Sequence, residues 1–209
     1  MPAFPVDTPS TDRAKQILDA AERCFVRSGF HRSTMQDVAA EAGMSPGNLY
    51  RYFASKDAMA AGLAERDRAE IARDFAVLDD TQDFAKDFLS LGRKHLIEEP
   101  REHAILCLEI WAEATRNPAF ATMSRAFECD VIDRMASAFR AAQARGAIAA
   151  DIDAHSVAVA ITTFANGLFV RRAVSPDFNP ERELATLDAL VGAMLSGALK
   201  LPPLTDETS

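Results

Sequence analysis

Residues 33–57 read STMQDVAAEAGMSPGNLYRYFASKD, and this stretch carries the signals of two short helices separated by a tight turn. Ser33 and Gln36 fit a capping box at the start of the first helix, and a glycine fits its end. Ser45 fits the cap of the second helix, with Pro46 at the first helical position, where proline is favoured. A helix of about nine residues, a tight turn and a second short helix have the spacing of a helix-turn-helix.

Both tyrosines of the chain, Tyr50 and Tyr52, lie in the second helix or directly after it, with Arg51 between them. At about 100° per residue, Leu49 and Phe53 share one face, which we expect to point inward, and Tyr50 points elsewhere. The second helix of such a pair enters the major groove of DNA, where a tyrosine ring can contact a thymine methyl and its hydroxyl a base or phosphate. The tyrosines are therefore predicted to meet DNA. The alternative is that they fill a small helical core.

Charge is distributed unevenly along the chain. The 209 residues hold 23 Lys and Arg against 31 Asp and Glu, a net charge of −8, and an acidic surface repels phosphate. Residues 1–60, however, contain seven basic and seven acidic side chains, so the whole negative excess lies in residues 61–209. The two parts are electrostatically different, which indicates two separate tasks.

Apolar residues recur at helical spacing along almost the whole chain, and Gly and Pro separate the periodic segments. The pattern predicts an all-α fold of about nine helices, in which a three-helix domain with the helix-turn-helix is followed by a larger helical domain. The expected parts are a flexible arm over residues 1–10, a DNA-binding domain over 11–60, a helical domain over 61–200 and a tail over 201–209. Expected helices beyond the helix-turn-helix start at Ser55 and then cover Gln82–Glu98, Arg101–Thr115, Pro118–Arg145, the segment from Asp153 to before Pro176, and Pro180–Lys200.

Several classes of protein are disfavoured by missing signals. The first residues lack the basic start and apolar core of a signal peptide, and no run of about twenty apolar residues occurs, so we expect a cytoplasmic chain without a membrane span. Three widely spaced cysteines without a CxxC pair fit reduced thiols. The motifs GxSxG, HExxH, GxGxxG and the Walker loop are absent, so neither an enzyme nor a cofactor is expected. His95 and His103 lie near acidic residues, but Pro100 separates them, which favours a solvated polar turn over a metal site.

The run ILDAAERCFVRSGFHRSTMQDVAAEAGMSPGNLYRYFASKDAM resembles the DNA-binding domain of the TetR family of transcriptional regulators, and the resemblance covers residues 12–60. A second stretch, LEIWAEATRNPAF, resembles a subset of the family that shares a type of C-terminal domain. The resemblance implies an all-helical homodimer whose residues 61–200 bind an effector and dimerise. Carried over by position, the residues implied to approach base edges are Gln36, Pro46, Gly47 and Tyr50. Those implied to hold phosphates are Ser33, Thr34, Asn48, Arg51, Tyr52 and Lys56.

The resemblance also implies that the last two helices pair with the same helices of a second subunit. The expected interface residues are Val157, Ala158, Ile161, Ala165, Leu168, Leu184, Leu187, Val191, Met194 and Leu195. The alternative is that these side chains are buried within one subunit. Candidate walls of an effector pocket are Phe84, Phe88, Trp111, Met123, Phe127 and Phe164. Aromatic residues also dominate ordinary cores, so plain core positions are the alternative for each of them.

Together these features predict a homodimeric, sequence-specific regulator, a repressor that a small and largely apolar effector releases from an inverted-repeat operator. One alternative is a helix-turn-helix regulator without a small-molecule effector, controlled by a protein partner or by its own abundance. Another is a helical-bundle enzyme or carrier with a vestigial DNA-binding fold, which would need a catalytic cluster that the sequence does not contain.

Overall fold

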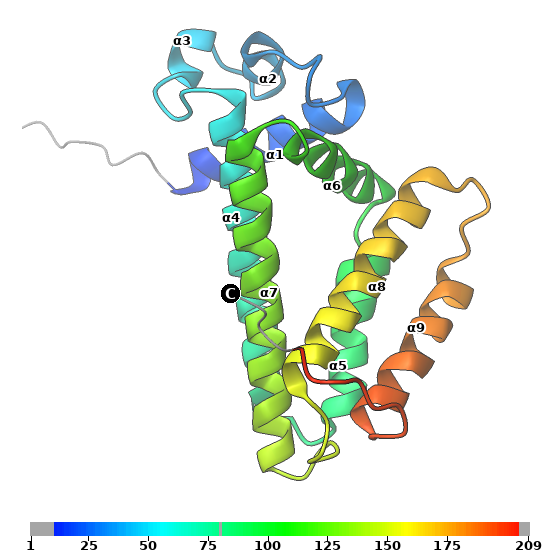
Figure 1. The fold of residues 1–209 in the computed structure, drawn as a ribbon. Coiled ribbons are helices and arrows are strands. Elements are labelled where there is room, and N and C mark those ends of the chain that lie inside the picture. The colour runs from blue at the N-terminus through cyan, green and yellow to red at the C-terminus, as the bar shows by residue number, and fades with distance from the viewer. Residues whose placement is uncertain (1–10, 80, 205–209) are drawn as a thin grey trace, which may run out of the picture. The chain divides into compact units, whose positions relative to one another are not determined.

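The computed structural model describes residues 11–79 and 81–204 of the chain. Over these residues the backbone forms nine α-helices, one 3₁₀ turn and one π-helix, and it contains no strand (Figure 1). The predicted all-α fold is thereby confirmed. The expected arm, residues 1–10, and the last five residues of the expected tail lie outside the described residues.

The helices fall into two compact units. The first ends at Arg66 and the second begins at Asp67, so the division lies within helix α4, Lys56–Ala76. Each unit has its own buried residues.

The first unit contains α1 (Thr11–Ser28), α2 (Met35–Glu41), α3 (Pro46–Leu49) and the beginning of α4. One apolar stripe of α1 supplies much of its core, because residues three and four apart share a helix face. The fully or almost fully buried side chains of this core are Ile17, Ala20, Ala21, Cys24, Phe25, Val38, Ala39, Leu49, Met59, Ala60 and Leu63. Two glycines with positive φ end α1 and α2, namely Gly29 (φ 83°) and Gly43 (φ 63°), as their positions in the sequence predict.

The cap of α2 differs from the prediction. Thr34 rather than Ser33 is the N-cap residue, and Asp37 rather than Gln36 completes the capping box. The Ser33 hydroxyl instead lies 2.8 Å from the carbonyl oxygen of Gly29, in the interior of the unit. Because that hydroxyl is already engaged, the next residue with a hydroxyl caps the helix.

The second unit contains six further helical segments after α4 and the 3₁₀ turn η1 (Val77–Asp79). They are α5 (Phe84–Arg93), the π-helix η2 (Lys94–Glu98), α6 (Arg101–Ala114), α7 (Pro118–Ala144), α8 (Ala154–Val174) and α9 (Pro180–Leu195). Helices α6, α7 and α8 pack against one another, and α9 packs against α5 and α8. Polar side chains cap most of the N-termini: Asp83, Asn117, Asp153 and Asn179 each accept a hydrogen bond from a backbone N–H of the helix they precede.

Two helix ends differ from the sequence expectation. The expected helix Gln82–Glu98 becomes α5 and then changes to π geometry at Lys94, a change that side-chain periodicity does not reveal. The last helix ends at Leu195 rather than Lys200, because Gly197 adopts a positive φ of 75°. The N–H of Leu199 then donates to the carbonyl of Ala193 and closes the helix end.

Phenylalanine rings form the centre of the core of the second unit. Phe88 lies 5.1 Å from Phe139 and 6.0 Å from Phe84 between ring centroids, and Phe75 packs at its edge. Helix α8 adds Val157 and other apolar residues to the same core. Within the described residues, α8 is the one helix long and apolar enough to cross a bilayer by length and composition, yet its buried side contributes to this internal packing.

Candidate nucleic-acid interface

Helix α3 is the shortest helix of the first unit, and local signals hold it in place. The Ser45 hydroxyl accepts a hydrogen bond of 3.3 Å from the N–H of Asn48, and Pro46 occupies the first turn. Leu49 is completely buried and anchors the helix to the core. The opposite side therefore points outward, and Tyr50 is 51% exposed at the end of the helix.

Gly47 lies on this outward side of α3. No heavy atom lies within 4 Å of the position that a Cβ would take there, and its φ is not positive. The fold of the subunit thus accepts a side chain at this position. What a glycine offers instead is room outside the subunit, where a backbone can approach closely.

Helix α2 packs beside α3 and presents Gln36 on its exposed side. Its capping box holds both donors of Thr34: the hydroxyl lies 2.7 Å and the backbone N–H 2.9 Å from the Asp37 carboxylate. These hydrogen bonds hold the pKa of Asp37 below its ordinary value of 3.8. Thr34 can therefore donate to a phosphate only by exchanging its present acceptor.

Two arginines of α1 fix the C-terminal end of α2. Glu41 accepts a hydrogen bond of 2.8 Å from Arg23 and one of 2.9 Å from Arg27. The same contacts lower the pKa of the Glu41 carboxyl. Side-chain periodicity does not predict this anchor, because the partners are 18 and 14 positions apart in the sequence.

The expected phosphate contact of Ser33 is contradicted by its burial. The residue is 2% exposed, its hydroxyl reaches the carbonyls of Cys24 (3.1 Å) and Gly29 (2.8 Å), and its N–H donates to Gly29 as well. The hydroxyl and the N–H of Ser33 are thus both engaged within the subunit. Ser33 instead ties the connection between α1 and α2 to the end of α1.

The other expected DNA-contacting residues gather on two short segments. Pro46, Gly47, Asn48, Tyr50, Arg51 and Tyr52 share α3 and the turn that follows it. Arg51 is exposed, whereas Asn48 and Tyr52 are half-buried. Lys56 differs from all of these, because its ammonium group lies 2.6 Å from the carbonyl oxygen of Phe30 and 3.1 Å from that of His31.

The six expected pocket residues of the second unit do not form one wall. Phe84 and Phe88 belong to the aromatic core, whereas Phe164 is 48% exposed on α8, so these three side chains have different surroundings and their place in a pocket stays a prediction. Trp111 instead meets Phe169 edge-on, with ring centroids 6.2 Å apart. Met123 and Phe127 are both half-buried on α7.

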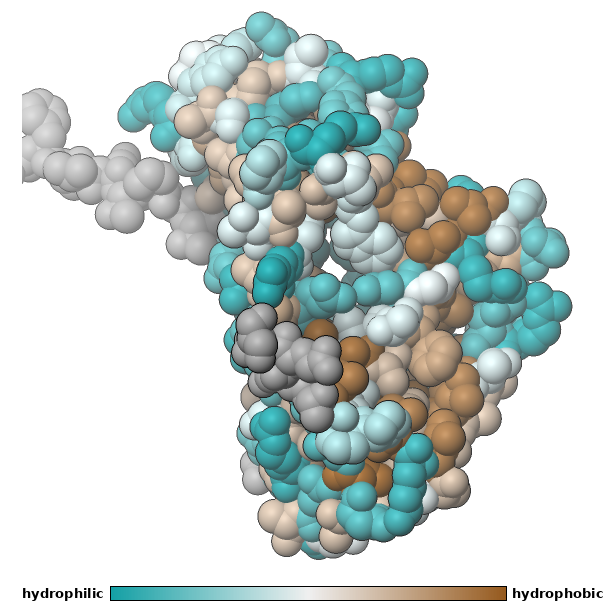
Figure 2. Space-filling view, in the orientation of Figure 1, coloured by the Kyte–Doolittle hydropathy of each residue, from teal (hydrophilic) through white to brown (hydrophobic). Residues whose placement is uncertain are grey.

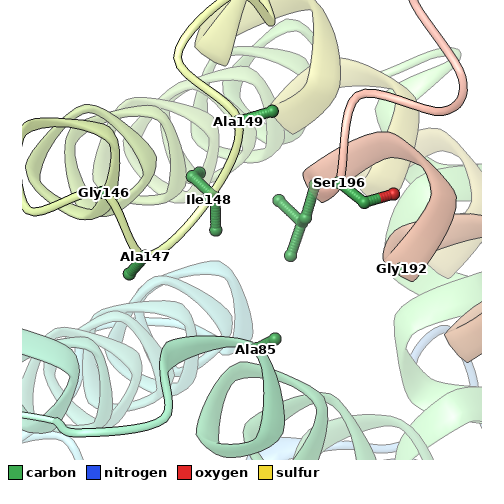
Figure 3. A pocket seen from close by; sticks show the side chains of 8 residues that line it. Ala85, Gly146, Ala147, Ile148, Ala149, Gly192 and Ser196 are labelled. Carbon is green, nitrogen blue, oxygen red and sulfur yellow. The ribbon is translucent and has the colours of Figure 1, made fainter.

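A hollow of about 430 Å³ lies elsewhere in the second unit (Figure 3). It is lined by Ala85, Gly146, Ala147, Ile148, Ala149, Gly192, Leu195 and Ser196, none of which was expected at a pocket. Among these residues only Ser196 has a polar side chain, so the hollow offers an apolar surface without a charged group.

The expected interface residues of α8 and α9 are mostly buried inside the subunit. Of the ten, only Ala165 is not classed as buried; the others are 8% exposed or less. Nine of the ten side chains are thus buried within one subunit, as the alternative states. The outward sides carry other residues: Phe164, Val170 and Val174 on α8, and Ala185, Ala189 and Gly192 on α9. Figure 2 shows hydrophobic residues gathered over these two helices.

Comparison with known proteins agrees with this architecture. Residues 17–63 match the bacterial regulatory proteins of the tetR family, and residues 95–196 match the C-terminal domain of BetI-type transcriptional repressors. The transcriptional regulator UidR of Escherichia coli K12 is 30% identical over 138 residues, which are 66% of this chain and 70% of UidR.

Solved structures extend the likeness to nearly the whole chain. GusR of Salmonella enterica is 26% identical, with a TM-score of 0.75 over 91% of this chain and 99% of GusR. The structure of a SmeT–triclosan complex is 23% identical, with a TM-score of 0.76 over 94% of this chain and 100% of SmeT, and it shares the fold. By its helix-turn-helix, its helical second unit and these relatives, the chain belongs to the TetR family of DNA-binding transcriptional regulators.

Proposed function

We propose that this regulator is a cytoplasmic homodimeric repressor that reads an inverted-repeat operator with α2, α3 and the turn after α3. The observation that carries the proposal is the two-sided construction of α3, in which Leu49 is completely buried while Gly47 and Tyr50 face outward. The N-terminal residues of such a helix meet base edges in the major groove. We assign base contacts to Gln36, Pro46, Gly47 and Tyr50, and phosphate contacts to Thr34, Asn48, Arg51 and Tyr52.

Dimerisation through α8 and α9 is supported by their outward sides. Phe164, Val170 and Val174 expose apolar surface on α8, and the exposed residues of α9 include small ones that permit close approach of a second helix. A two-fold axis would place two copies of α3 about one DNA turn, roughly 34–36 Å, apart on an inverted repeat. The buried apolar residues of α8 and α9 would then hold the two helices on the core of their own subunit.

We infer an apolar or aromatic effector for the second unit. Trp111 and Phe169 form an aromatic pair, and two buried hydroxyl groups, of Ser124 and Thr162, have no hydrogen-bond partner among the described residues. Such hydroxyls can orient an otherwise apolar ligand. The SmeT structure holds triclosan, a compound of this chemical kind. An effector would lower operator affinity only by its preference for one of two states of the dimer.

A regulator without a small-molecule effector is the second candidate. It is favoured by the place of Phe84 and Phe88, which pack in a filled aromatic core rather than around a cavity. Control would then come from a protein partner or from the abundance of the regulator.

The first experiment is selection of bound duplexes from a random-sequence DNA pool by the purified protein at moderate salt. Enrichment of an inverted repeat is the expected result and supplies the operator as a probe. Release of that probe by triclosan, or by other apolar aromatics, would then separate the two candidates. Weak binding without sequence enrichment, also after refolding to remove any bound ligand, would refute the proposed operator recognition.

A further inference from the structure

The side chain of Lys56, the first residue of α4, turns back onto its own subunit. Its ammonium nitrogen lies 2.6 Å from the carbonyl oxygen of Phe30 and 3.1 Å from that of His31. The same nitrogen lies 4.8 Å from the centroid of the Phe30 ring. Lys56 therefore contacts the connection between α1 and α2, which is 25 and 26 positions away in the sequence.

These contacts use most of the hydrogen-bond donors of the lysine ammonium group. An ammonium group has three N–H donors and no acceptor, and two of the donors have carbonyl partners here. The ring face adds a cation–π attraction. A DNA phosphate that reached Lys56 would find one donor remaining, or would have to displace a carbonyl.

The connection that Lys56 grips determines where α2 begins. The connection leaves α1 at Gly29, and the Phe30 ring packs against Phe25 with the ring centroids 5.1 Å apart. The buried Ser33 hydroxyl contacts the carbonyl oxygens of Cys24 and Gly29. The next residue is the N-cap of α2. A shift of the connection therefore moves the start of α2 and the side chains that α2 presents.

We propose that Lys56 is a positioning residue, which clamps the connection between α1 and α2 so that Gln36 and the N-cap of α2 are held ready for DNA. In this role the two carbonyl contacts exist before DNA binds and persist afterwards. The inference rests on the proposed DNA-binding face. It departs from the expectation, implied by family resemblance, that Lys56 serves as a phosphate contact.

Salt dependence distinguishes the two roles. Removing a phosphate contact makes the slope of log affinity against log salt shallower by about 0.9 per subunit. Loss of a positioning contact lowers affinity at every salt concentration and leaves the slope unchanged. Lys56→Met, which keeps most of the aliphatic stem, is expected to lose about tenfold in operator affinity, as for one or two net hydrogen bonds. Arg51→Met is the matched control, expected to make the slope shallower.

Hydrogen exchange of the free protein supplies a second readout. In Lys56→Met the amides of α2 should exchange faster than in the wild type, while those of α7 stay unchanged. Lys56→Arg keeps a cation with several donors and should restore both affinity and protection. A shallower slope for Lys56→Met with unchanged exchange in α2 would overturn the inference.

A measurement on the unmodified protein keeps the test independent of variant folding. Acetylation of lysines, followed by mass spectrometry, should find Lys56 protected in the free protein relative to exposed Lys86, with little change when operator is added. Reactivity equal to that of Lys86 in the free protein, with protection only on DNA, would refute the clamp. If wild-type protein binds no operator at all, the proposed function fails, and the acetylation of free protein still decides the role of Lys56.

Discussion

Single residues decide which part of the helix-turn-helix can meet DNA. At the end of α3, two neighbouring residues differ in exposure: Leu49 is completely buried, and Tyr50 is half exposed. Gly47 stands out because the fold leaves open space where a side chain would be. Because the subunit itself has room for a larger side chain at position 47, the glycine is a candidate for close contact with DNA.

We predict that Gly47→Ala separates stability from binding. Alanine in a helix is favoured over glycine by about 0.5–1 kcal/mol, so thermal stability should stay equal or rise slightly. Operator affinity should fall at least severalfold, because the added methyl group would face DNA. Thermal melts and fluorescence anisotropy with the selected operator measure the two effects. Gly92→Ala in α5, which also adds a methyl into open space, is the control and should leave affinity unchanged.

A second residue-scale prediction concerns the buried Arg172 of α8. Its guanidinium donates at 2.9 Å to the carbonyls of Leu96 and Ile97, and also to that of Glu99. Burial lowers the pKa of this arginine, and its guanidinium donates to backbone carbonyl oxygens. These carbonyls lie at the end of η2, where intrahelical partners are missing.

Arg172→Met should therefore cost about 1–3 kcal/mol of unfolding free energy, because buried carbonyls lose their donors. Chemical denaturation followed by circular dichroism tests this. The neighbouring exposed Arg171, which pairs with Glu183 at 2.7 Å, is the control. Arg171→Met should cost less than about 1 kcal/mol, as for other surface ion pairs. Equal costs for the two variants would contradict the assigned role of Arg172.

Among the elements, α2 depends on a charged cap that titrates. Asp37 has a folded pKa below its ordinary value of 3.8, because its carboxylate accepts two hydrogen bonds from Thr34. A depressed folded pKa means that the stabilising contribution is complete above the unfolded pKa. It is lost as the pH falls through the folded pKa.

Asp37→Asn should accordingly lower the melting temperature at pH 6 to 7, and the difference from wild type should shrink once the pH drops below 3.8. Melting curves at a series of pH values measure this. Asp79→Asn, at an exposed carboxylate of η1, serves as the control and should change the melting temperature little at any pH. A difference for Asp37→Asn that is constant with pH would show that the carboxylate charge is not what stabilises α2.

At the scale of the whole molecule, assembly depends on surfaces that remain after each subunit has formed its core. Val157, Ile161 and Met194 are used internally, whereas Phe164 and Val174 remain exposed. If α8 and α9 form the dimer interface, a bulky charge among the small exposed residues of α9 should prevent close approach.

Ala189→Arg is expected to convert the dimer to a monomer and to weaken operator binding by at least tenfold, because each monomer would hold a single half-site. Light scattering after size-exclusion chromatography measures the mass. Val77→Arg, at an exposed valine of η1, is the control and should stay dimeric. A dimeric Ala189→Arg variant would move the interface away from α9.

The helices and the helix-turn-helix can be predicted from the amino-acid sequence, because they follow from local signals. Ser45 and Pro46 start α3, Gly43 ends α2, and helical periodicity identifies the long helices of the second unit. Neighbouring residues suffice for such features. In contrast, the hydrogen-bond partners of Ser33 and Lys56 are backbone carbonyls in remote or irregular segments, and no pattern of side chains predicts them.

Tertiary structure alone decided which apolar residues are core and which are surface on α8 and α9. Both sets have helical spacing, and a helix that is apolar on several sides has no single preferred face to read from sequence. Packing against α5, α6 and α7 covers one side and leaves Phe164, Val170 and Val174 outside. Which apolar face of a helix is removed from water depends on the elements that pack against it, and these elements are distant in the chain.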